Sequence, residues 1–287
     1  MIKIYKKTSP GRRFSSVLIR EDVTTSKPEK SLLRPLKKRG GRNHLGVITC
    51  RHKGGGAKKL YRVIDFKRTI DGVPATVKTI EYDPNRNCNI ALVVYEQGEA
   101  WQHQKRYILA PQGLKVGQKV YNGENAEPRL GNCLPLSKIP AGLEVHNVEL
   151  RPGQGGKLVR TAGGVARLAA KDGKFAHLVM PSGEMRMVNA KCRATIGQLS
   201  NIDYASIRWG KAGRKRHLGI RPTTRGSAMN PHAHPMGGGE GRRSGGRHPV
   251  SPWGQLAKGG KTRKRRNPNN KMILRRRRNV RTGQLVL

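Results

Sequence analysis

The sequence predicts an all-β protein, with two small barrels in tandem and a long basic extension on either side. The central part of the chain contains short runs of β-branched and apolar residues, each bounded by Gly, Pro, Asn or Asp. No central segment shows a sustained 3.6-residue apolar stripe, which argues against a helical bundle. The positive charge is concentrated outside this part, in residues 1–60 and 204–287, as is typical of a folded body with cationic extensions.

The first barrel is predicted over residues 61–131. Its strands are expected in four runs that are rich in β-branched or aromatic residues and end at turn residues. The pair Asp71-Gly72 precedes the second run and predicts a turn. The runs are "LYRVIDFKR" (60–68), "ATVKTIEY" (75–82), "NIALVVYEQGEA" (89–100) and "KRYILAP" (105–111).

The second barrel is predicted over residues 132–203. Asp172-Gly173 and Ser182-Gly183 lie between apolar runs, where two-residue hairpin turns belong. The two sets of strands span about 140 residues, which is too long for one minimal five-stranded barrel and fits two. The seam is expected in the Gly- and Pro-rich segment 131–142. The runs of the second set are "LEVHNVEL" (143–150), "KLVRTA" (157–162), the stretch 165–188 and "CRATIG" (192–197).

The two extensions carry the charge that indicates the partner. Residues 1–60 contain 17 basic and 3 acidic side chains and residues 204–287 contain 22 and 1, against 20 and 13 in residues 61–203. A formal net charge of +42 opposes compaction unless a polyanion cancels it, and a nucleic acid is the densest such partner. The extensions are expected to be extended, and disordered without that partner, because they contain too little apolar surface to offset chain entropy. An anionic membrane is the other candidate partner, but the sequence contains neither a basic amphipathic helix nor an apolar run near ~18 residues.

Cysteine usage and the chain start bear on the compartment. The cysteines are widely spaced and lack C-x-x-C pairs, so the sequence predicts neither a zinc site nor a disulfide framework and fits a reducing compartment. The start, "MIKIYKKTSPGRR", is basic and has no apolar segment after it, so no secretory signal is expected. We interpret it as a basic arm, although an organellar presequence has a similar composition. The cysteines are Cys50, Cys88, Cys133 and Cys192.

The stretch "AMNPHAHPMGGGEGRRSGG" (228–246) allows two interpretations. His232, His234 and Glu240 could form a metal or hydrolytic site, but a third histidine, an H-E-x-x-H pattern and paired cysteines are all missing from the stretch. The alternative is a loop against phosphates, in which Gly237–Gly239 let backbone N–H groups approach closely and the arginines supply forked donors. We favour the nucleic-acid loop and predict no metal.

Other glycine-rich and basic segments also allow more than one interpretation. The run "CRHKGGGAKKLYR" (50–62) is either a flexible hinge or a second phosphate loop, and the residues do not decide between them. Neither "GQLAKGGKT" (254–262) nor "RPGQGGKLV" (151–159) has the spacing of a nucleotide-binding loop. The basic segments 210–226 and 261–281 predict arms that neutralise phosphates.

Aromatic rings outside the expected core can stack on bases. Trp253 is the best candidate, since it lies in "HPVSPWG" away from the predicted strands, whereas Trp101 is expected to close a barrel end. Together these patterns predict the following RNA-binding residues: Arg51, His52, Lys53, Gly54, Gly55, Gly56, Lys58, Lys59, Arg62, Lys211, Arg214, Lys215, Arg216, Arg221, Arg225, Asn230, His232, His234, Gly237, Gly238, Gly239, Arg242, Arg243, Arg247, Trp253, Lys261, Arg263, Lys264, Arg265 and Arg266.

Segment 210–242 resembles the signature region of the universal large-subunit ribosomal protein 2 family, because "PTTRGSAMNP" is followed by "HPMGGGEGR". The stretches "IEYDPNRN", "RYILAP", "GNCLPL" and "HPVSPWG" are similar to landmarks of the same family, so the resemblance covers essentially residues 1–287. It implies an OB-fold barrel followed by an SH3-like barrel. It also implies primary binding of large-subunit rRNA in assembly, association with the small subunit, proximity to the peptidyl transferase centre, and other ribosomal proteins as partners.

The resemblance places His234 at a family histidine that lies in an Asp-His-Pro-His-Gly-Gly-Gly context and was proposed to assist peptide-bond formation. Ala233 stands where the family usually has an acid, and Met236 where it often has a second histidine. Without the acid, His234 lacks a neighbour that would orient its ring for proton transfer. This departure favours a role in packing or RNA contact, and no catalytic residue is predicted.

We therefore expect a non-enzymatic protein of the ribosome, in the cytoplasm or an organelle, without a cofactor beyond Mg²⁺ associated with rRNA. Two alternatives stay open. One is a metal-assisted RNA hydrolase that uses His232, His234 and Glu240, and the other is a protein that compacts nucleic acid without sequence preference.

Overall fold

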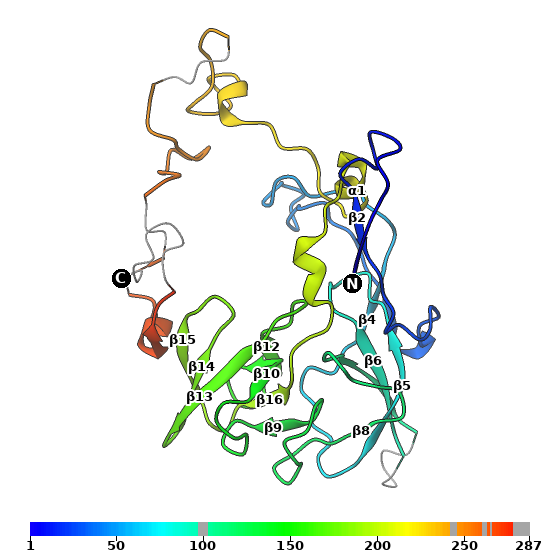
Figure 1. The fold of residues 1–287 in the computed structure, drawn as a ribbon. Coiled ribbons are helices and arrows are strands. Elements are labelled where there is room, and N and C mark those ends of the chain that lie inside the picture. The colour runs from blue at the N-terminus through cyan, green and yellow to red at the C-terminus, as the bar shows by residue number, and fades with distance from the viewer. Residues whose placement is uncertain (97–102, 242–245, 260–262, 265, 278–287) are drawn as a thin grey trace. The chain divides into compact units, whose positions relative to one another are not determined.

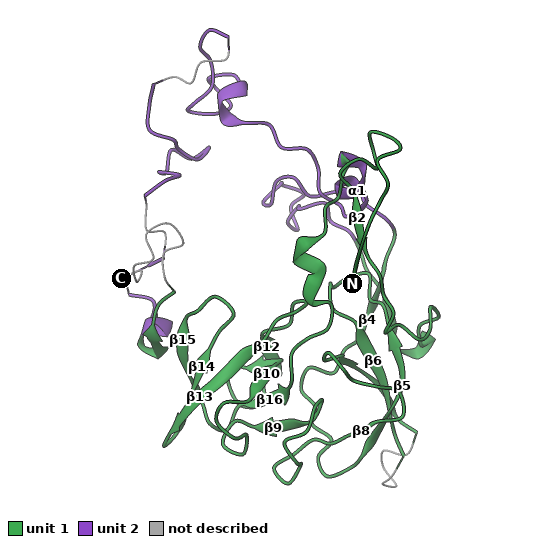
Figure 2. Ribbon diagram, viewed as in Figure 1, with its two compact units in different colours: residues 1–37, 58–211, 271–287 green, residues 38–57, 212–270 purple. Residues whose placement is uncertain are grey.

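The structure is a computed structural model that describes residues 1–96, 103–241, 246–259, 263–264 and 266–277. It divides into two compact units, coloured separately in Figure 2. Unit 1 comprises residues 1–37, 58–211 and 271–287, and unit 2 comprises residues 38–57 and 212–270. Among the described residues, the α-helical content is the six-residue helix α1 (Ala212–His217), and strands make up both barrels of unit 1 (Figure 1). The predicted all-β class is confirmed.

The first barrel of unit 1 is built on a four-stranded antiparallel sheet with the order β7-β6-β5-β8. The central strand β6 is buried on both faces, because Val93 and Tyr95 pack into one apolar cluster while Ile90 and Leu92 pack into another. This two-sided burial explains why its sequence reads as a continuous apolar run instead of an alternating one. The strands are β5 (Ala75–Glu81), β6 (Ile90–Tyr95), β7 (Lys105–Leu109) and β8 (Lys119–Val120).

Residues 1–37 are attached to this barrel at several points. The Thr24 N–H donates to the Ile80 carbonyl at 2.9 Å, and the Glu29 N–H donates to the Tyr107 hydroxyl at 2.8 Å. The Tyr107 hydroxyl in turn donates to the buried Glu81 carboxylate at 2.8 Å. The expectation of a largely extended N-terminal segment misses these pairings, since composition does not reveal partners that are distant in sequence. The paired strands are β1 (Ile2–Ile4) with β2 (Ser16–Leu18) and β3 (Leu33–Pro35) with β4 (Leu60–Arg62).

The second barrel is built on a seven-stranded sheet with the order β17-β15-β14-β13-β10-β16-β9, next to the two-stranded ribbon β11–β12. The segment 131–142, predicted as the seam, contributes strand β9 and the buried side chains of Leu134, Leu136 and Ile139. The C-terminal segment returns to this sheet as the edge strand β17. The strands are β9 (Cys133–Pro135), β10 (Glu144–His146), β11 (Val148–Glu149), β12 (Gly156–Leu158), β13 (Ala166–Asp172), β14 (Phe175–Val179), β15 (Met185–Asn189), β16 (Arg193–Ile196) and β17 (Ile273–Arg275).

Hairpin turns lie at both predicted positions of this barrel, but the predicted length of two residues holds only for the first, because the Met180 N–H donates to the Glu184 carbonyl and leaves three residues in the second turn. Asp172 pairs with Phe175, so the β13–β14 turn consists of two residues, and Gly173 in it has a positive φ of 49°. The β14–β15 turn contains Gly183 with a φ of 81°. Both glycines adopt the left-handed backbone that a side chain would disfavour.

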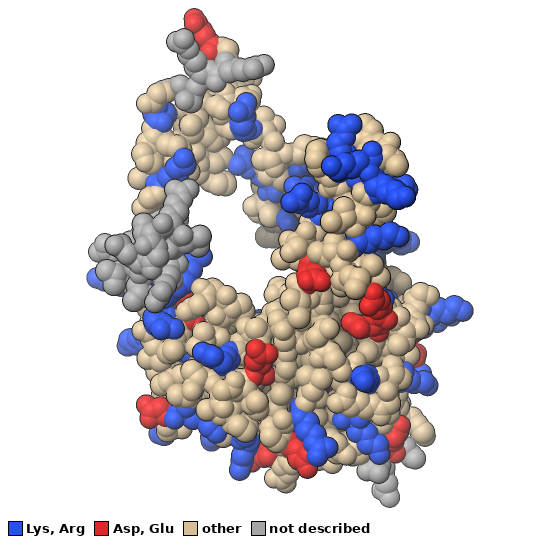
Figure 3. Space-filling model, in the orientation of Figure 1, with Lys and Arg blue, Asp and Glu red and all other residues tan. Residues whose placement is uncertain are grey.

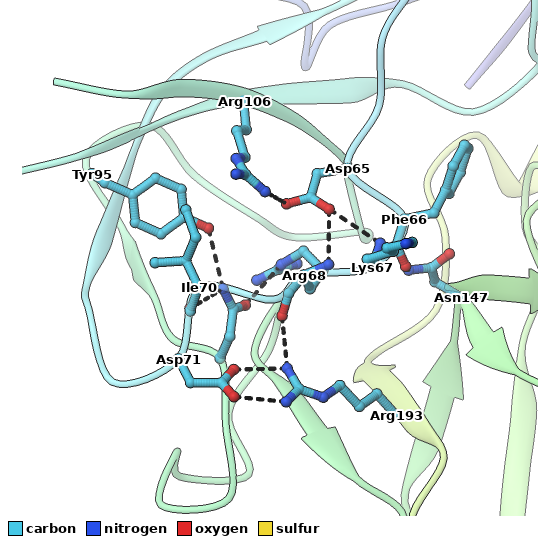
Figure 4. Close-up of polar contacts among 11 residues, drawn as sticks. Asp65, Phe66, Lys67, Arg68, Ile70, Asp71, Tyr95, Arg106, Asn147 and Arg193 are labelled. Atoms are coloured by element: carbon cyan, nitrogen blue, oxygen red, sulfur yellow. Dashed lines mark hydrogen bonds and ion pairs between the residues drawn. The ribbon is translucent and has the colours of Figure 1, made fainter. Parts of the chain in front are cut away.

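A polar network joins the two barrels (Figure 4). Arg193 of β16 donates through Nη1 and Nη2 to the two carboxylate oxygens of Asp71, at 2.7 and 2.6 Å, and through Nη1 to the Arg68 carbonyl at 2.8 Å. The buried Glu149 carboxylate accepts the N–H groups of Gly155 and Arg193 at 2.8 and 3.0 Å. The Gly156 N–H donates to the Phe66 carbonyl at 2.9 Å, so one backbone bond adds to the charge-assisted bonds of Arg193 and Glu149 at the barrel junction.

His146 lies fully buried in the second barrel. Its Nδ1–H donates to the Gly197 carbonyl at 2.7 Å, and its Nε2 has no hydrogen-bond partner within the described residues. Burial lowers the pKa of His146 from 6.5 to about 4, since the charged imidazolium would be desolvated.

Acidification from pH 7 to pH 5 is expected to lower the free energy of unfolding by about 2 kcal/mol, since the unfolded chain protonates His146 near pH 6.5 and the folded chain only near pH 4. Urea unfolding at the two pH values measures the change. His146→Gln is expected to remove most of it, whereas His177→Gln, at a partly exposed position of β14, should retain it. Equal pH dependence in the wild type and His146→Gln would contradict this account.

Candidate nucleic-acid interface

Unit 2 concentrates positive charge. Residues 38–57 and 212–270 contain 19 Lys and Arg and a single acid, Glu240. On the face shown in Figure 3, blue side chains gather over the segment that contains α1, where few red ones lie. One carboxylate cannot neutralise the charge of 19 cations, so an external polyanion is the expected counter-charge.

The triple glycine of residues 54–56 forms a fixed turn. The Lys38 Nζ donates to the carbonyls of Gly55, Gly56 and Ala57 at 3.3, 2.8 and 2.6 Å. The Ala57 N–H donates to the His217 carbonyl at the end of α1, and a Cβ on Gly56 would lie 2.8 Å from the backbone nitrogen of Gly219. These contacts argue against a flexible hinge, and the phosphate loop stays a prediction.

The neighbouring loop 41–50 is equally well defined. Its Asn43 Oδ1 accepts the N–H groups of Leu45 and Val47, both at 3.0 Å, which closes a side-chain turn. The N–H groups of Thr49 and Cys50 both donate to the Gly41 carbonyl at 3.0 Å. Gly41 has a positive φ of 77°, and a Cβ there would overlap the Cys50 carbonyl, so only glycine fits.

These two loops enclose a pocket of about 730 Å³ together with the segment around Arg221. Its cationic lining comes from Lys38, Arg39, Arg42, Arg51, Lys53 and Arg221. No carboxylate lines it within the part of the chain that the structure describes. The sequence reasoning included Arg51, Lys53 and Arg221 but missed Lys38, Arg39 and Arg42; their position beside the pair Gly40-Gly41 is the signal that could have found them.

The two histidines of the "HAH" stretch have different environments. His234 is buried, its Nδ1 accepts the Met236 N–H at 3.0 Å, and a Cβ on Gly226 would overlap its ring. His232 is exposed. The described residues contain no group of three or more His, Cys, Asp or Glu that could hold a metal. His234 thus packs inside its own loop.

The remaining predicted residues differ in their contacts and in their exposure. Arg62 is buried, 4.0 Å from the Asp83 carboxylate, and the Lys59 Nζ donates to the Pro84 carbonyl at 2.7 Å. Trp253 is 76% exposed, and the Arg51 guanidinium lies 5.6 Å from its ring centroid. Arg242, Arg243, Lys261 and Arg265 lie outside the described residues. Exposed members are Lys58, Lys211, Lys215, Arg216, Arg225, Asn230, Gly239, Arg247, Arg263, Lys264 and Arg266, and partly exposed ones are Arg214, Gly237 and Gly238.

A second cationic feature, which the sequence analysis missed, lies on unit 1. The guanidinium groups of Arg160 and Arg86 lie 4.5 and 5.7 Å from the Phe66 ring centroid. Phe66 belongs to the barrel junction, where its carbonyl accepts the Gly156 N–H. Nothing in the local sequence indicates this grouping, because the residues come from separate segments.

Comparison with protein-family models covers most of the chain. Residues 29–122 match "Ribosomal Proteins L2, RNA binding N-terminal domain", and residues 129–254 match "Ribosomal Proteins L2, C-terminal domain". The chain belongs to the ribosomal protein L2 family. The resemblance seen in the sequence is confirmed, and with it a structural, RNA-binding role in the ribosome. No helix among the described residues is long and apolar enough to cross a membrane.

Replacing His234 tests its packing role. His234→Ala is expected to speed amide hydrogen exchange at Met236 by about fivefold, since a hydrogen bond of about 1 kcal/mol is lost. Residue-resolved exchange measures this, with His232→Ala as the exposed control. Unchanged exchange at Met236 in His234→Ala would show that the ring does not hold the loop.

Proposed function

We propose that this protein is a primary binder of large-subunit rRNA that acts in assembly of the subunit. One observation carries the proposal: 19 cations of unit 2 share their segments with one acid, and several of them line a pocket on well-defined loops. The membership in the L2 family supports the ribosomal setting. The interface is therefore expected to match RNA phosphates.

The binding mechanism is electrostatic and steric. Each cation that contacts a phosphate releases condensed counterions, which drives association. Glycines without side chains allow backbone N–H groups to come close to the strand. The exposed Trp253 ring offers a face on which an unpaired base can stack.

The barrels of unit 1 supply a second contact area. Arg86 is held by the buried Asp83 carboxylate at 2.5 Å, so its guanidinium is fixed near Phe66. Arg160 lies over the same ring. Planar guanidinium groups contact phosphates and bases well, which supports an RNA contact at the barrel junction.

The finer roles extend this proposal. We place the protein at the intersubunit side of the large subunit, near the peptidyl transferase region, with other ribosomal proteins and the small subunit as partners. It acts without catalysis and without a cofactor beyond Mg²⁺ bound with the rRNA, in the ribosomes of the cytoplasm or of an organelle. The packing of His234 supports a role without catalysis, since the Nδ1 of its ring accepts the Met236 N–H and so stabilises the loop.

The affinity for large-subunit rRNA is expected to fall steeply with salt, by about 10³ or more between 50 and 200 mM, because several phosphates are neutralised at once. Filter binding or fluorescence anisotropy over a salt series measures the slope. Lys215→Gln together with Arg216→Gln should reduce the slope by about one to two phosphate contacts. A slope near zero would contradict the electrostatic mechanism.

Competition and fractionation separate the proposal from its alternatives. Folded rRNA should outcompete duplex DNA at matched salt, because RNA is recognised by shape and unpaired bases. The protein should also co-sediment with large subunits through a high-salt wash. Equal affinity for DNA would favour a nonspecific compacting protein, and stoichiometric zinc with RNA cleavage that His234→Ala abolishes would favour a hydrolase.

A further inference from the structure

The cationic pocket of unit 2 has a more specific chemistry than general RNA binding requires. We propose that it is a preformed site for a compact group of adjacent phosphates, of the kind that a sharply bent RNA strand presents. This inference rests on the proposed RNA-binding function and names the part of the ligand that the pocket takes.

The charge of the pocket is uncompensated. Arg39, Arg42, Arg51, Lys53 and Arg221 line it, and within the described residues none of the five has an ion-pair partner. The sixth cation, Lys38, is committed to three carbonyls of the glycine turn. Convergent like charges repel one another, so an anion with several charges is the ligand that this pocket stabilises most.

The lining also argues against a nucleobase as the occupant. Among the described residues that line the pocket, Ile48 is the one aliphatic side chain and His52 the one aromatic ring, and the His52 Nδ1–H is already bonded to the Pro222 carbonyl. A pocket for a base would offer aromatic or aliphatic walls with a few placed polar groups. The volume of about 730 Å³ exceeds what a single phosphate occupies and admits two or three linked phosphates with their water.

The pocket geometry exists without a ligand. The Arg221 N–H donates to the His52 carbonyl at 3.0 Å, and the His52 Nδ1–H donates to the Pro222 carbonyl at 3.0 Å. Lys53 forms a β-bridge with Ile220, and the Gly54 N–H donates to the Gly219 carbonyl at 3.0 Å. These bonds hold the segment 52–54 beside the segment 219–222, so little ordering entropy is lost on binding.

Inorganic tripolyphosphate tests the pocket, because it carries linked phosphates without sugar or base. Calorimetric titration of the full, nucleic-acid-free chain should show one site per chain, and inorganic phosphate should bind at least about tenfold more weakly, since it makes fewer charge-assisted bonds. Arg51→Gln and Arg221→Gln should each weaken tripolyphosphate binding by about three- to tenfold. Arg167→Gln, on an exposed position of β13 in unit 1, makes the same change of charge and should leave the affinity within about twofold.

Hydrogen exchange on the wild-type chain gives a readout that does not depend on a variant folding. Tripolyphosphate should slow exchange at the amides of loops 41–50 and 52–56 and leave the barrels unchanged. Binding of many tripolyphosphates per chain, weakened equally by Arg167→Gln, would overturn the inference, as would unchanged exchange in these loops. Competition identifies the source: displacement by a bent rRNA fragment assigns the pocket to the RNA strand, and its absence assigns the pocket to free oligophosphate.

Parallel measurement of rRNA affinity separates the two proposals. If the wild type binds rRNA but has no tripolyphosphate site, the pocket inference fails and the proposed function stands. If the wild type binds tripolyphosphate at one site but does not prefer rRNA to duplex DNA, the proposed function fails instead.

Discussion

Repulsion among uncompensated cations is the constraint under which unit 2 must fold. With a single acid among 19 Lys and Arg in its segments, carboxylates cannot hold its loops together. The loops are held instead by bonds to backbone groups: Lys38 donates to three carbonyls, Asn43 accepts two N–H groups and His234 accepts one. This arrangement leaves the guanidinium groups at the pocket available to an anion. The excess of cations over carboxylates therefore explains both why backbone bonds hold the loops of unit 2 and why the unit is proposed to bind phosphates.

Unit 1 uses its acids differently. Asp71 pairs with Arg193, Asp65 with Arg106 and Asp83 with Arg86. The first of these pairs joins the two barrels, and the buried Glu149 carboxylate ties a loop of the second barrel to the same junction. Ion pairs at partly buried positions add geometric definition more reliably than they add stability. The two barrels of unit 1 are thus joined by defined polar contacts.

The local features of the fold could be predicted from the sequence, because they depend on neighbouring residues. The strands β5, β6 and β7 lie within runs recognised by their β-branched residues, and the turns at Gly173 and Gly183 lie where small polar pairs separate apolar runs. The pairing of β3 with β4 could not be predicted, since its strands are short, basic and far apart in sequence. For the same reason the contact of Glu29 with Tyr107 has no sequence signal.

The candidate site, too, could be predicted from the sequence only in part. Composition alone determined that the partner is a polyanion and that the terminal segments carry the charge, because net charge is a sum that needs no coordinates. Only the tertiary structure decided which cations share a pocket, that the triple glycine forms a fixed turn, and that His234 is buried while His232 is exposed. The reason is that the segments 38–57 and 212–222 are brought together by long-range backbone bonds, and no local pattern specifies which distant segment completes a loop.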